Sequence, residues 1–181
     1  LKHRSQAKHY KEKAEKDNIL VRNSRGRLLP TSTSSNPSLI TLPIMGEANC
    51  GPATKLAHDQ VTGSISFTPS VLKRKLRQGS FAVKAVGDSM NTSNIHGLRL
   101  ENGDLAIVEP TVWQDAADGE YVLSVIDDVA NIKKLKLDTQ NQQILLCSES
   151  TEYTDDIVIA AEDLYSYRIA GKVVGVIKGN K

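Results

Sequence analysis

The sequence is poor in cysteine and contains no long apolar run. Two cysteines in 181 residues are too few for a disulfide framework. No apolar stretch approaches the ~18 residues that a membrane-spanning helix requires, and no basic-then-apolar leader precedes a small-residue cleavage site. We therefore expect a cytoplasmic protein that does not use a membrane.

Aromatic residues are also scarce, with one Trp, five Tyr and two Phe, so Val, Ile, Leu and Ala must supply most of the core. Such a core favours β-strands. Short β-rich runs bounded by Gly, Asn or Pro occur at residues 81–86, 104–108, 121–126, 144–147 and 173–177. They predict a mostly-β domain with a curled or barrel-like sheet. Two brief exceptions are a helix expected over 70–76 and a turn over 91–96.

Motifs for metals and phosphates are missing as well. The sequence has no paired Cys spacing and no His-Glu-x-x-His, and its four histidines are scattered at His3, His9, His58 and His96. No metal and no cofactor is therefore predicted. The Gly-x-Ser-x-Gly motif is absent too, and although a Ser-His-Asp triad with His58 or His96 stays open, no pattern supports it.

Charge is distributed unevenly although its sum is only +2. Residues 1–30, the basic head, hold nine Lys or Arg against three acids, a net charge of +6, whereas the rest of the chain carries −4. A basic head on an acidic body suggests that the head contacts a polyanion. A solvated charged helix is the alternative.

The pattern inside the head favours nucleic-acid binding. An amphipathic helix is expected over 4–17, followed by a strand-like run at 19–22, a turn at 23–26 and a second run at 27–29. Thirty residues cannot bury a core alone, so we interpret residues 1–30 as the second half of a small domain. This part resembles a winged helix-turn-helix, and the hydroxyl-rich stretch 31–41 is interpreted as a linker.

In winged helices the recognition helix reads bases and the wing contacts phosphates, so the resemblance implies operator DNA as a partner. The residues expected to face bases are Ser5, Gln6, Lys8 and His9. Those expected to face phosphates are Lys11, Arg25 and Arg27.

Two residues of the body are candidates for catalysis. Ser89 follows a strand and the sequence Gly87-Asp88, where a sharp turn can leave backbone amides pointing at a substrate. In the run 131–137 a two-residue period places Lys133 on one face with Leu135 and Leu137. Lys133 is therefore the lysine expected to enter an apolar interior.

Burial would give that lysine a chemical use. A free lysine has a pKa near ~10.4 and is protonated at neutral pH, whereas desolvation can lower this pKa by up to ~3–5 units. A neutral amine can accept the proton of a serine hydroxyl, so a Ser-Lys dyad needs no histidine. The alternative is that Ser89 caps a turn and Lys133 is one of three surface lysines on an edge strand.

Several motifs occur together in one order: Leu42-Pro43-Ile44-Met45-Gly46, Cys50-Gly51, residues 82–90, residues 101–108, Ile132-Lys133-Lys134-Leu135 and Val174-Gly175-Val176-Ile177. Over residues 42–178 they resemble the self-cleaving peptidase domain of LexA-type repressors, phage repressors and the mutagenesis protein UmuD. The resemblance implies a LexA-like Ser-Lys peptidase domain of short curled strands over residues 42–181, preceded by the partial winged helix.

The resemblance also implies roles for individual residues. Ser89 would be the nucleophile, Lys133 its neutral base, Cys50-Gly51 the scissile bond, and the amides of Asp88 and Ser89 the oxyanion site. It further implies a homodimer formed through the C-terminal strand near residues 172–178 and stimulation of cleavage by the RecA filament on single-stranded DNA. Two functions follow: a repressor of the DNA-damage (SOS) response, or a UmuD-like polymerase accessory protein.

The chain departs from the LexA pattern in places. Its scissile dipeptide is Cys-Gly rather than Ala-Gly, as in UmuD and some phage repressors, and Pro52 follows directly. Residues 91–100 and 111–118 are interpreted as loop insertions. Cys50 could alternatively be only a reactive or buried thiol.

Overall fold

The computed structural model describes residues 20–22, 27–30, 39–49 and 61–179. The chain divides into two compact units, residues 1–38 and 39–181. In the first unit, β1 (Leu20–Arg22) and β2 (Leu28–Pro30) form an antiparallel hairpin in which Val21 lies opposite Leu29. The helix expected over 4–17 lies outside the described residues, so the winged helix stays a prediction beyond this hairpin.

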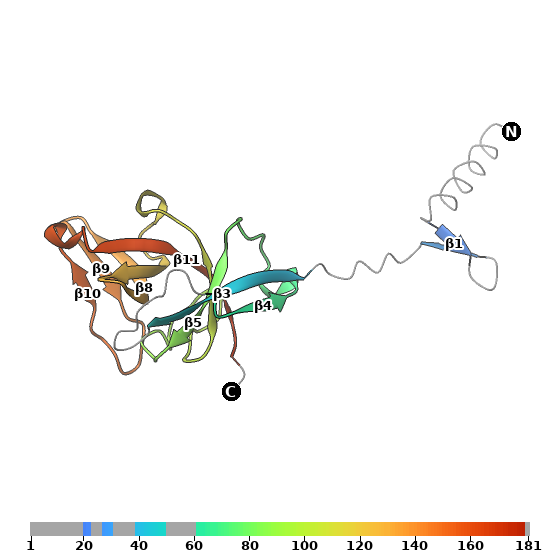
Figure 1. Cartoon of the computed structure of the whole chain (residues 1–181), viewed down its shortest axis with the longest axis horizontal. Helices are drawn as coiled ribbons and strands as arrows, with labels where there is room; N and C mark the ends of the chain where they lie inside the picture. The colour runs from blue at the N-terminus through green and yellow to red at the C-terminus, as the bar shows by residue number, and fades with distance from the viewer. Residues whose placement is uncertain (1–19, 23–26, 31–38, 50–60, 180–181) are drawn as a thin grey trace. The chain divides into compact units, whose positions relative to one another are not determined.

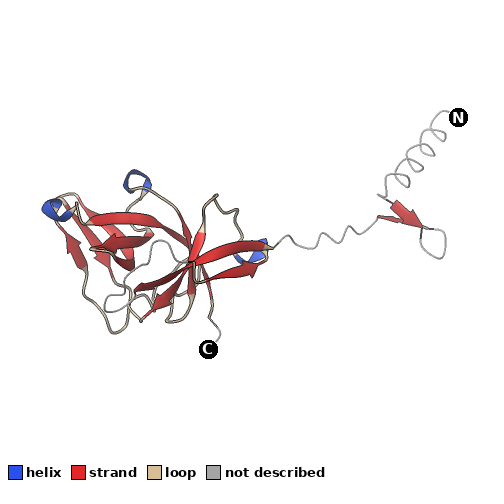
Figure 2. Ribbon diagram, viewed as in Figure 1, coloured by secondary structure: helices blue, strands red, loops and turns tan. Residues whose placement is uncertain are grey.

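In the second unit, which we call the main unit, the secondary structure of the described residues is almost wholly β-strand (Figures 1 and 2). Its nine-stranded sheet has the order β10-β9-β8-β7-β11-β6-β5-β3-β4. The strands are β3 (Ile40–Asn49), β4 (Gly63–Phe67), β5 (Phe81–Val86), β6 (Leu105–Glu109), β7 (Tyr121–Ile126), β8 (Val129–Asp138), β9 (Gln143–Cys147), β10 (Ile157–Ile159) and β11 (Tyr167–Ile177). The prediction of a mostly-β domain is confirmed.

An additional pairing curls this sheet into a ring. Asn49 at the end of β3 pairs in parallel with Asn131 of β8, which joins two strands that are five places apart in the sheet order. Strands β3, β5, β6, β11, β7 and β8 therefore close on themselves, while β4, β9 and β10 extend beyond the ring. Ring closure protects strand edges and leaves an enclosed interior.

The interior is filled by aliphatic side chains, as the shortage of aromatic residues predicts. The largest group of fully buried residues includes Val83, Met90, Leu123 and Ile132. A second cluster packs around Leu135 and Leu146 where β8 and β9 pair. Because side chains on both faces of β8 are buried near its middle, this strand passes between two apolar layers.

Two sequence predictions are wrong in their boundaries. The helix expected over 70–76 is only a 3-10 helix, η1 (Pro69–Val71), because Lys73 adopts a left-handed φ of 52° that ends it. Strand β3 begins at Ile40, inside the stretch interpreted as a linker over 31–41, because Ile40 and Thr41 pair with Phe67 and Ser66 of β4.

The remaining helices of the described segments are short. They are the 3-10 helices η2 (Trp113–Asp115) and η3 (Ala161–Asp163). No helix in the part of the chain that the structure describes is long and apolar enough to cross a bilayer.

Candidate active site

Ser89 lies in a tight turn at the end of β5. Gly87 has a φ of +93°, a conformation that glycine adopts without strain, and this reverses the chain directly after the strand. The Gly87 amide donates a hydrogen bond to the Asn102 side chain at 3.0 Å, which fixes the turn. Ser89 is then only 2% exposed, whereas the neighbouring Asp88 lies at the surface.

Lys133 reaches the same place from β8. It lies opposite Val122 of β7 and is 6% exposed, so its side chain runs through the apolar layer that the two-residue period predicts. The neighbouring Lys134 points to the other face, where it forms an ion pair with Glu149 at 2.7 Å. Of the three lysines in this run, Lys133 is therefore the one taken into the interior.

The two side chains meet. Lys133 Nζ and Ser89 Oγ are 2.6 Å apart, in hydrogen-bond contact, although the residues are 44 positions apart in the chain. An amine in this position can take the hydroxyl proton directly. Burial of both groups removes the water that would compete for this contact, and desolvation by itself favours an uncharged amine.

The strand that leads to the expected scissile bond ends beside both groups. Asn49, the last residue of β3, pairs with Val86 of β5, three residues before Ser89. It also pairs with Asn131 of β8, two residues before Lys133. Cys50 and Gly51 lie outside the described residues, but the residue that precedes them is held between the two strands that carry Ser89 and Lys133.

The segment after β9 contacts both residues, the Lys133 amine and the Ser89 main chain, and no sequence pattern predicts this. Ser148 Oγ is 3.0 Å from Lys133 Nζ, and the Glu149 amide donates to the Ser89 carbonyl at 2.9 Å. Glu149 also accepts a hydrogen bond of 2.5 Å from Tyr121. Burial and the Glu149 carboxylate raise the pKa of Tyr121, so this hydroxyl keeps its proton and acts as the donor.

Cys147 adjoins this segment but is not a nucleophile at neutral pH. Burial and the neighbouring Asp156 carboxylate raise the pKa of its thiol to about 11. The described residues also contain no group of three or more His, Cys, Asp or Glu side chains that could hold a metal ion.

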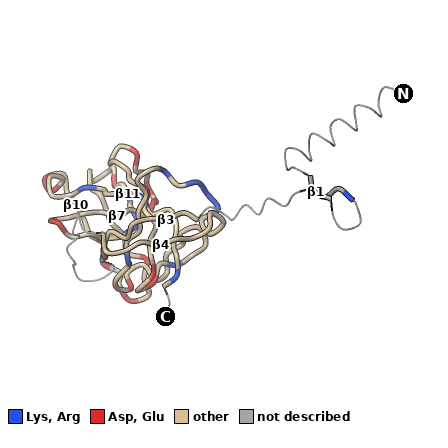
Figure 3. The backbone as a smooth tube through the Cα atoms, turned by 45° about the vertical axis from the view of Figure 1, so that its right-hand side comes forward, with Lys and Arg blue, Asp and Glu red and all other residues tan. Residues whose placement is uncertain are grey.

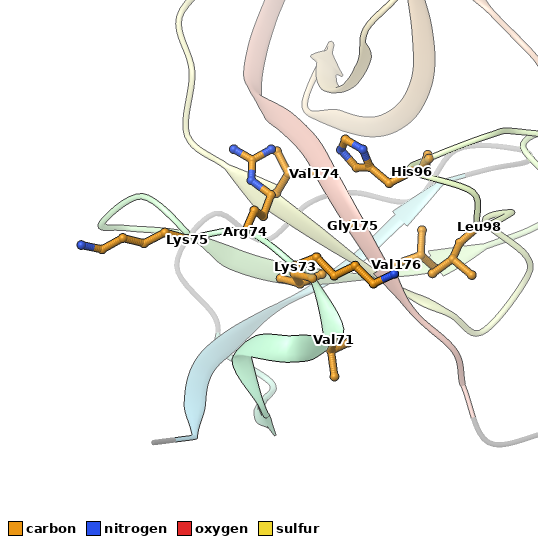
Figure 4. A pocket seen from close by; sticks show the side chains of 11 residues that line it. Val71, Lys73, Arg74, Lys75, His96, Leu98, Val174, Gly175 and Val176 are labelled. Atoms are coloured by element: carbon orange, nitrogen blue, oxygen red, sulfur yellow. The ribbon is translucent and has the colours of Figure 1, made fainter. Parts of the chain in front are cut away.

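A pocket of about 640 Å³ lies elsewhere on the main unit (Figure 4). Its lining comes from η1 and the basic turn that follows it, from the tight turn at 95–98, and from residues 174–176 of β11. Lys73, Arg74, Lys75 and Arg77 lie close together in the chain. Figure 3 colours the backbone blue at Lys and Arg. His96, one of the two histidines considered for a triad, lines this pocket, and His58 lies outside the described residues.

The DNA-binding predictions fall almost wholly outside the described residues. This applies to Ser5, Gln6, Lys8, His9, Lys11 and Arg25. Arg27 alone is described, and it is exposed directly before β2. Its role stays a prediction.

A ring of strands that buries a serine hydroxyl against a lysine amine agrees with the outcome of the sequence comparisons. The family model described as Peptidase S24-like matches residues 43–174, and the chain belongs to this family. The prediction of a LexA-type Ser-Lys peptidase family is thereby confirmed.

One curated relative is the LexA repressor of Oleidesulfovibrio alaskensis (strain ATCC BAA-1058 / DSM 17464 / G20). It is 35% identical over 141 residues, which cover 76% of this chain and 59% of the relative. The chain therefore spans about three fifths of the length of that repressor.

Proposed function

We propose that the chain is a LexA-like repressor of the DNA-damage (SOS) response that inactivates itself by cutting its own Cys50-Gly51 bond. Ser89 is the nucleophile and Lys133 the general base. The observation that carries the proposal is the 2.6 Å contact between Ser89 Oγ and Lys133 Nζ, both buried. Membership of the S24-like family supports the reaction class.

The reaction proceeds in two steps. In the first, the Ser89 hydroxyl proton passes to the neutral Lys133 amine while Oγ attacks the Cys50 carbonyl carbon. The amides of Asp88 and Ser89 stabilise the oxyanion, and the bond from Cys50 to the Gly51 nitrogen then breaks as Lys133 returns the proton to that nitrogen. In the second, Lys133 takes a proton from water while the water oxygen attacks the ester carbon. The bond from this carbon to Ser89 Oγ then breaks as Lys133 returns the proton to Oγ, which frees the Cys50 carboxyl group and restores the serine and the neutral lysine.

The position of β3 supports Cys50-Gly51 as the bond. A strand that ends at Asn49 between β5 and β8 delivers the next residues to Ser89 and Lys133 with little loss of chain entropy. Gly51 has no side chain, so the backbone can enter a confined site. The substrate is thus a segment of the same chain.

The repressor role rests on the basic head. The β1-β2 hairpin has the strand pairing that a wing requires, and Arg27 is exposed beside it. In a complete winged helix the base-reading residues would be Ser5, Gln6, Lys8 and His9, and Lys11, Arg25 and Arg27 would hold phosphates. The LexA repressor among the relatives favours this role over that of a UmuD-like polymerase accessory protein.

A homodimer completes the proposal. Strand β7 pairs with β11 only as far as Lys172, whereas β6 pairs with β11 as far as Ile177. One edge of residues 173–177 is therefore not paired by β7, and the pocket of Figure 4 opens beside residues 174–176. A second copy joining this edge fits operator binding by two heads.

The RecA filament on single-stranded DNA is the proposed trigger of cleavage.

Incubation of the purified chain at mildly alkaline pH tests the chemistry. Alkali increases the neutral fraction of Lys133, so the rate of self-cleavage is expected to rise with pH. Mass spectrometry should find fragments 1–50 and 51–181. Ser89→Ala and Lys133→Ala should each abolish the fragments, and Lys134→Ala, on the opposite face of β8, is the matched control. Fragments with any other junction would contradict Cys50-Gly51 as the site.

A further inference from the structure

Ser148 contacts the same lysine amine as Ser89 does. Its Oγ lies 3.0 Å from Lys133 Nζ, and it is the first residue after β9. We propose that Ser148 is a positioning residue that aims the Lys133 amine at Ser89. This inference rests on the proposed function, since it matters only if Lys133 is the base.

The hydrogen bonds of Ser148 make its hydroxyl oxygen an acceptor toward Lys133. Its hydroxyl donates to the Asp155 carbonyl at 3.0 Å, so its oxygen faces Lys133 as an acceptor. A neutral amine has one lone pair and two N–H groups. Because Ser148 takes an N–H and has no proton left to offer, it does not compete for the lone pair, which can point at the Ser89 hydroxyl.

The backbone holds this serine in register with the nucleophile. The Ser148 amide donates to Asp156 Oδ1 at 3.2 Å, and the next amide, that of Glu149, donates to the Ser89 carbonyl at 2.9 Å. In return, the Thr92 amide donates to the Glu149 carbonyl at 3.0 Å. Two consecutive residues thus touch both the proposed base and the proposed nucleophile, so a shift of one is passed to the other.

The same acceptor also favours the protonated amine. When Lys133 takes the proton of Ser89, Ser148 Oγ accepts a hydrogen bond from the ammonium, and such a bond raises an amine pKa relative to its absence. Loss of the Ser148 hydroxyl should therefore move the pH midpoint of cleavage downwards while it slows the reaction. A purely structural role predicts a slower reaction with an unmoved midpoint.

Other charged groups near this segment could also affect the pH midpoint, so none of the variants replaces them. They are Asp88 beside Ser89, Glu149 paired with Lys134, and Asp156 beside Cys147 and the Ser148 amide. Ser150 provides a matched control two residues further on. Its hydroxyl oxygen accepts bonds from the Glu152 and Tyr153 amides.

The test measures first-order rate constants for self-cleavage of the full chain from neutral to strongly alkaline pH. Ser148→Ala is expected to lower the plateau rate about tenfold or more and to move the midpoint to lower pH. Ser148→Thr keeps a hydroxyl and should retain both the rate and the midpoint within about twofold. Ser150→Ala should behave like the unmodified chain.

The two proposals fail in different ways. If the unmodified chain is not cut, or Ser89→Ala is cut as fast as the unmodified chain, the proposed function is wrong. If those two proteins behave as expected but Ser148→Ala keeps both rate and midpoint, only the role of Ser148 is wrong. A loss of rate with an unmoved midpoint in Ser148→Ala also overturns that role, whether or not Ser148→Thr shares it.

Discussion

Gly171 lies in β11 where this strand runs against the end of β6. A Cβ atom added there would lie 2.4 Å from Val108 Cγ1 and 2.6 Å from the Glu109 carbonyl oxygen. The second neighbour is backbone and cannot rotate away. Gly171→Ala is therefore expected to reduce the free energy of unfolding by roughly 1–3 kcal/mol, measured by urea denaturation.

Gly63 is the matched comparison for this substitution. It also lies in a strand, β4, but an added Cβ would meet only Ile44 Cδ1 at 3.7 Å, an ordinary contact. Gly63→Ala should leave the free energy of unfolding within about 1 kcal/mol of the unmodified value or raise it. Equal losses at both positions would show that crowding against β6 is not what excludes a side chain from position 171.

The sequence pattern predicted the burial of some residues correctly and of others wrongly. Alternation along β8 predicts that Lys133 faces inward, and the structure buries it. The same alternation assigns Ile132 to a face with Lys134 and Lys136, yet Ile132 is fully buried because the ring interior covers that side. Ser148 carried no signal, since a serine after a strand has no motif and its partners come from β8 and a loop.

Asp104, directly before β6, is hydrogen-bonded to the residues that follow β11. Its carboxylate accepts hydrogen bonds from the Glu101 and Gly179 amides and from Lys178 Nζ, at 2.8, 2.9 and 2.8 Å. Burial alone would raise the pKa of this carboxyl, but the bond from Lys178 and the two amide bonds together lower it. A lowered pKa in the folded state stabilises the protein above the ordinary aspartate pKa, and this contribution is lost as pH falls.

Asp104→Asn should therefore reduce the free energy of unfolding by roughly 2 kcal/mol at neutral pH. The difference from the unmodified protein should shrink as the pH falls below about 4, the ordinary aspartate pKa, because the unfolded chain then takes up the proton first, and it should be smallest below the lowered pKa of the folded state. Urea unfolding of both proteins at neutral pH and below about pH 4 measures this difference. Asp128→Asn, in the exposed β7-β8 turn, should cost no more than about 0.5 kcal/mol at either pH.

Strands differed in how well the sequence predicted them. The apolar runs 81–86 and 121–126 coincide with β5 and β7, because several successive apolar residues there are buried on both faces. Strand β3 was not predicted, since Pro43 and Gly46 weaken its β signal and only its pairing with three other strands stabilises it. Strand β10 has three residues, too few for a period to be seen.

Ring closure is the feature that local patterns could not reveal. The contact between Asn49 and Asn131 joins residues more than eighty positions apart, and the meeting of Ser89 with Lys133 depends on the same curl. Spacing alone left the alternative of a surface lysine open. Only the ordered set of motifs favoured the buried pair.

Self-cleavage should be first order in protein, since the proposed nucleophile, base and scissile bond all belong to the unit 39–181. The rate constant is expected to stay within about twofold over a hundredfold dilution, measured by the appearance of fragment 51–181. Ser89→Ala protein mixed with intact chain serves as the control and should remain uncut in dilute solution. A rate constant proportional to concentration would indicate cutting between molecules.

Strand β3 belongs to the piece that a cut after Cys50 would detach. Its ten residues pair with β4, β5 and β8, and its Leu42 and Ala48 side chains are buried among residues of the other piece. Breaking one peptide bond does not remove those contacts. The two products of the proposed cut would therefore stay paired through β3 until this strand leaves the sheet, so hydrolysis and separation of the two pieces would be separate events with separate rates.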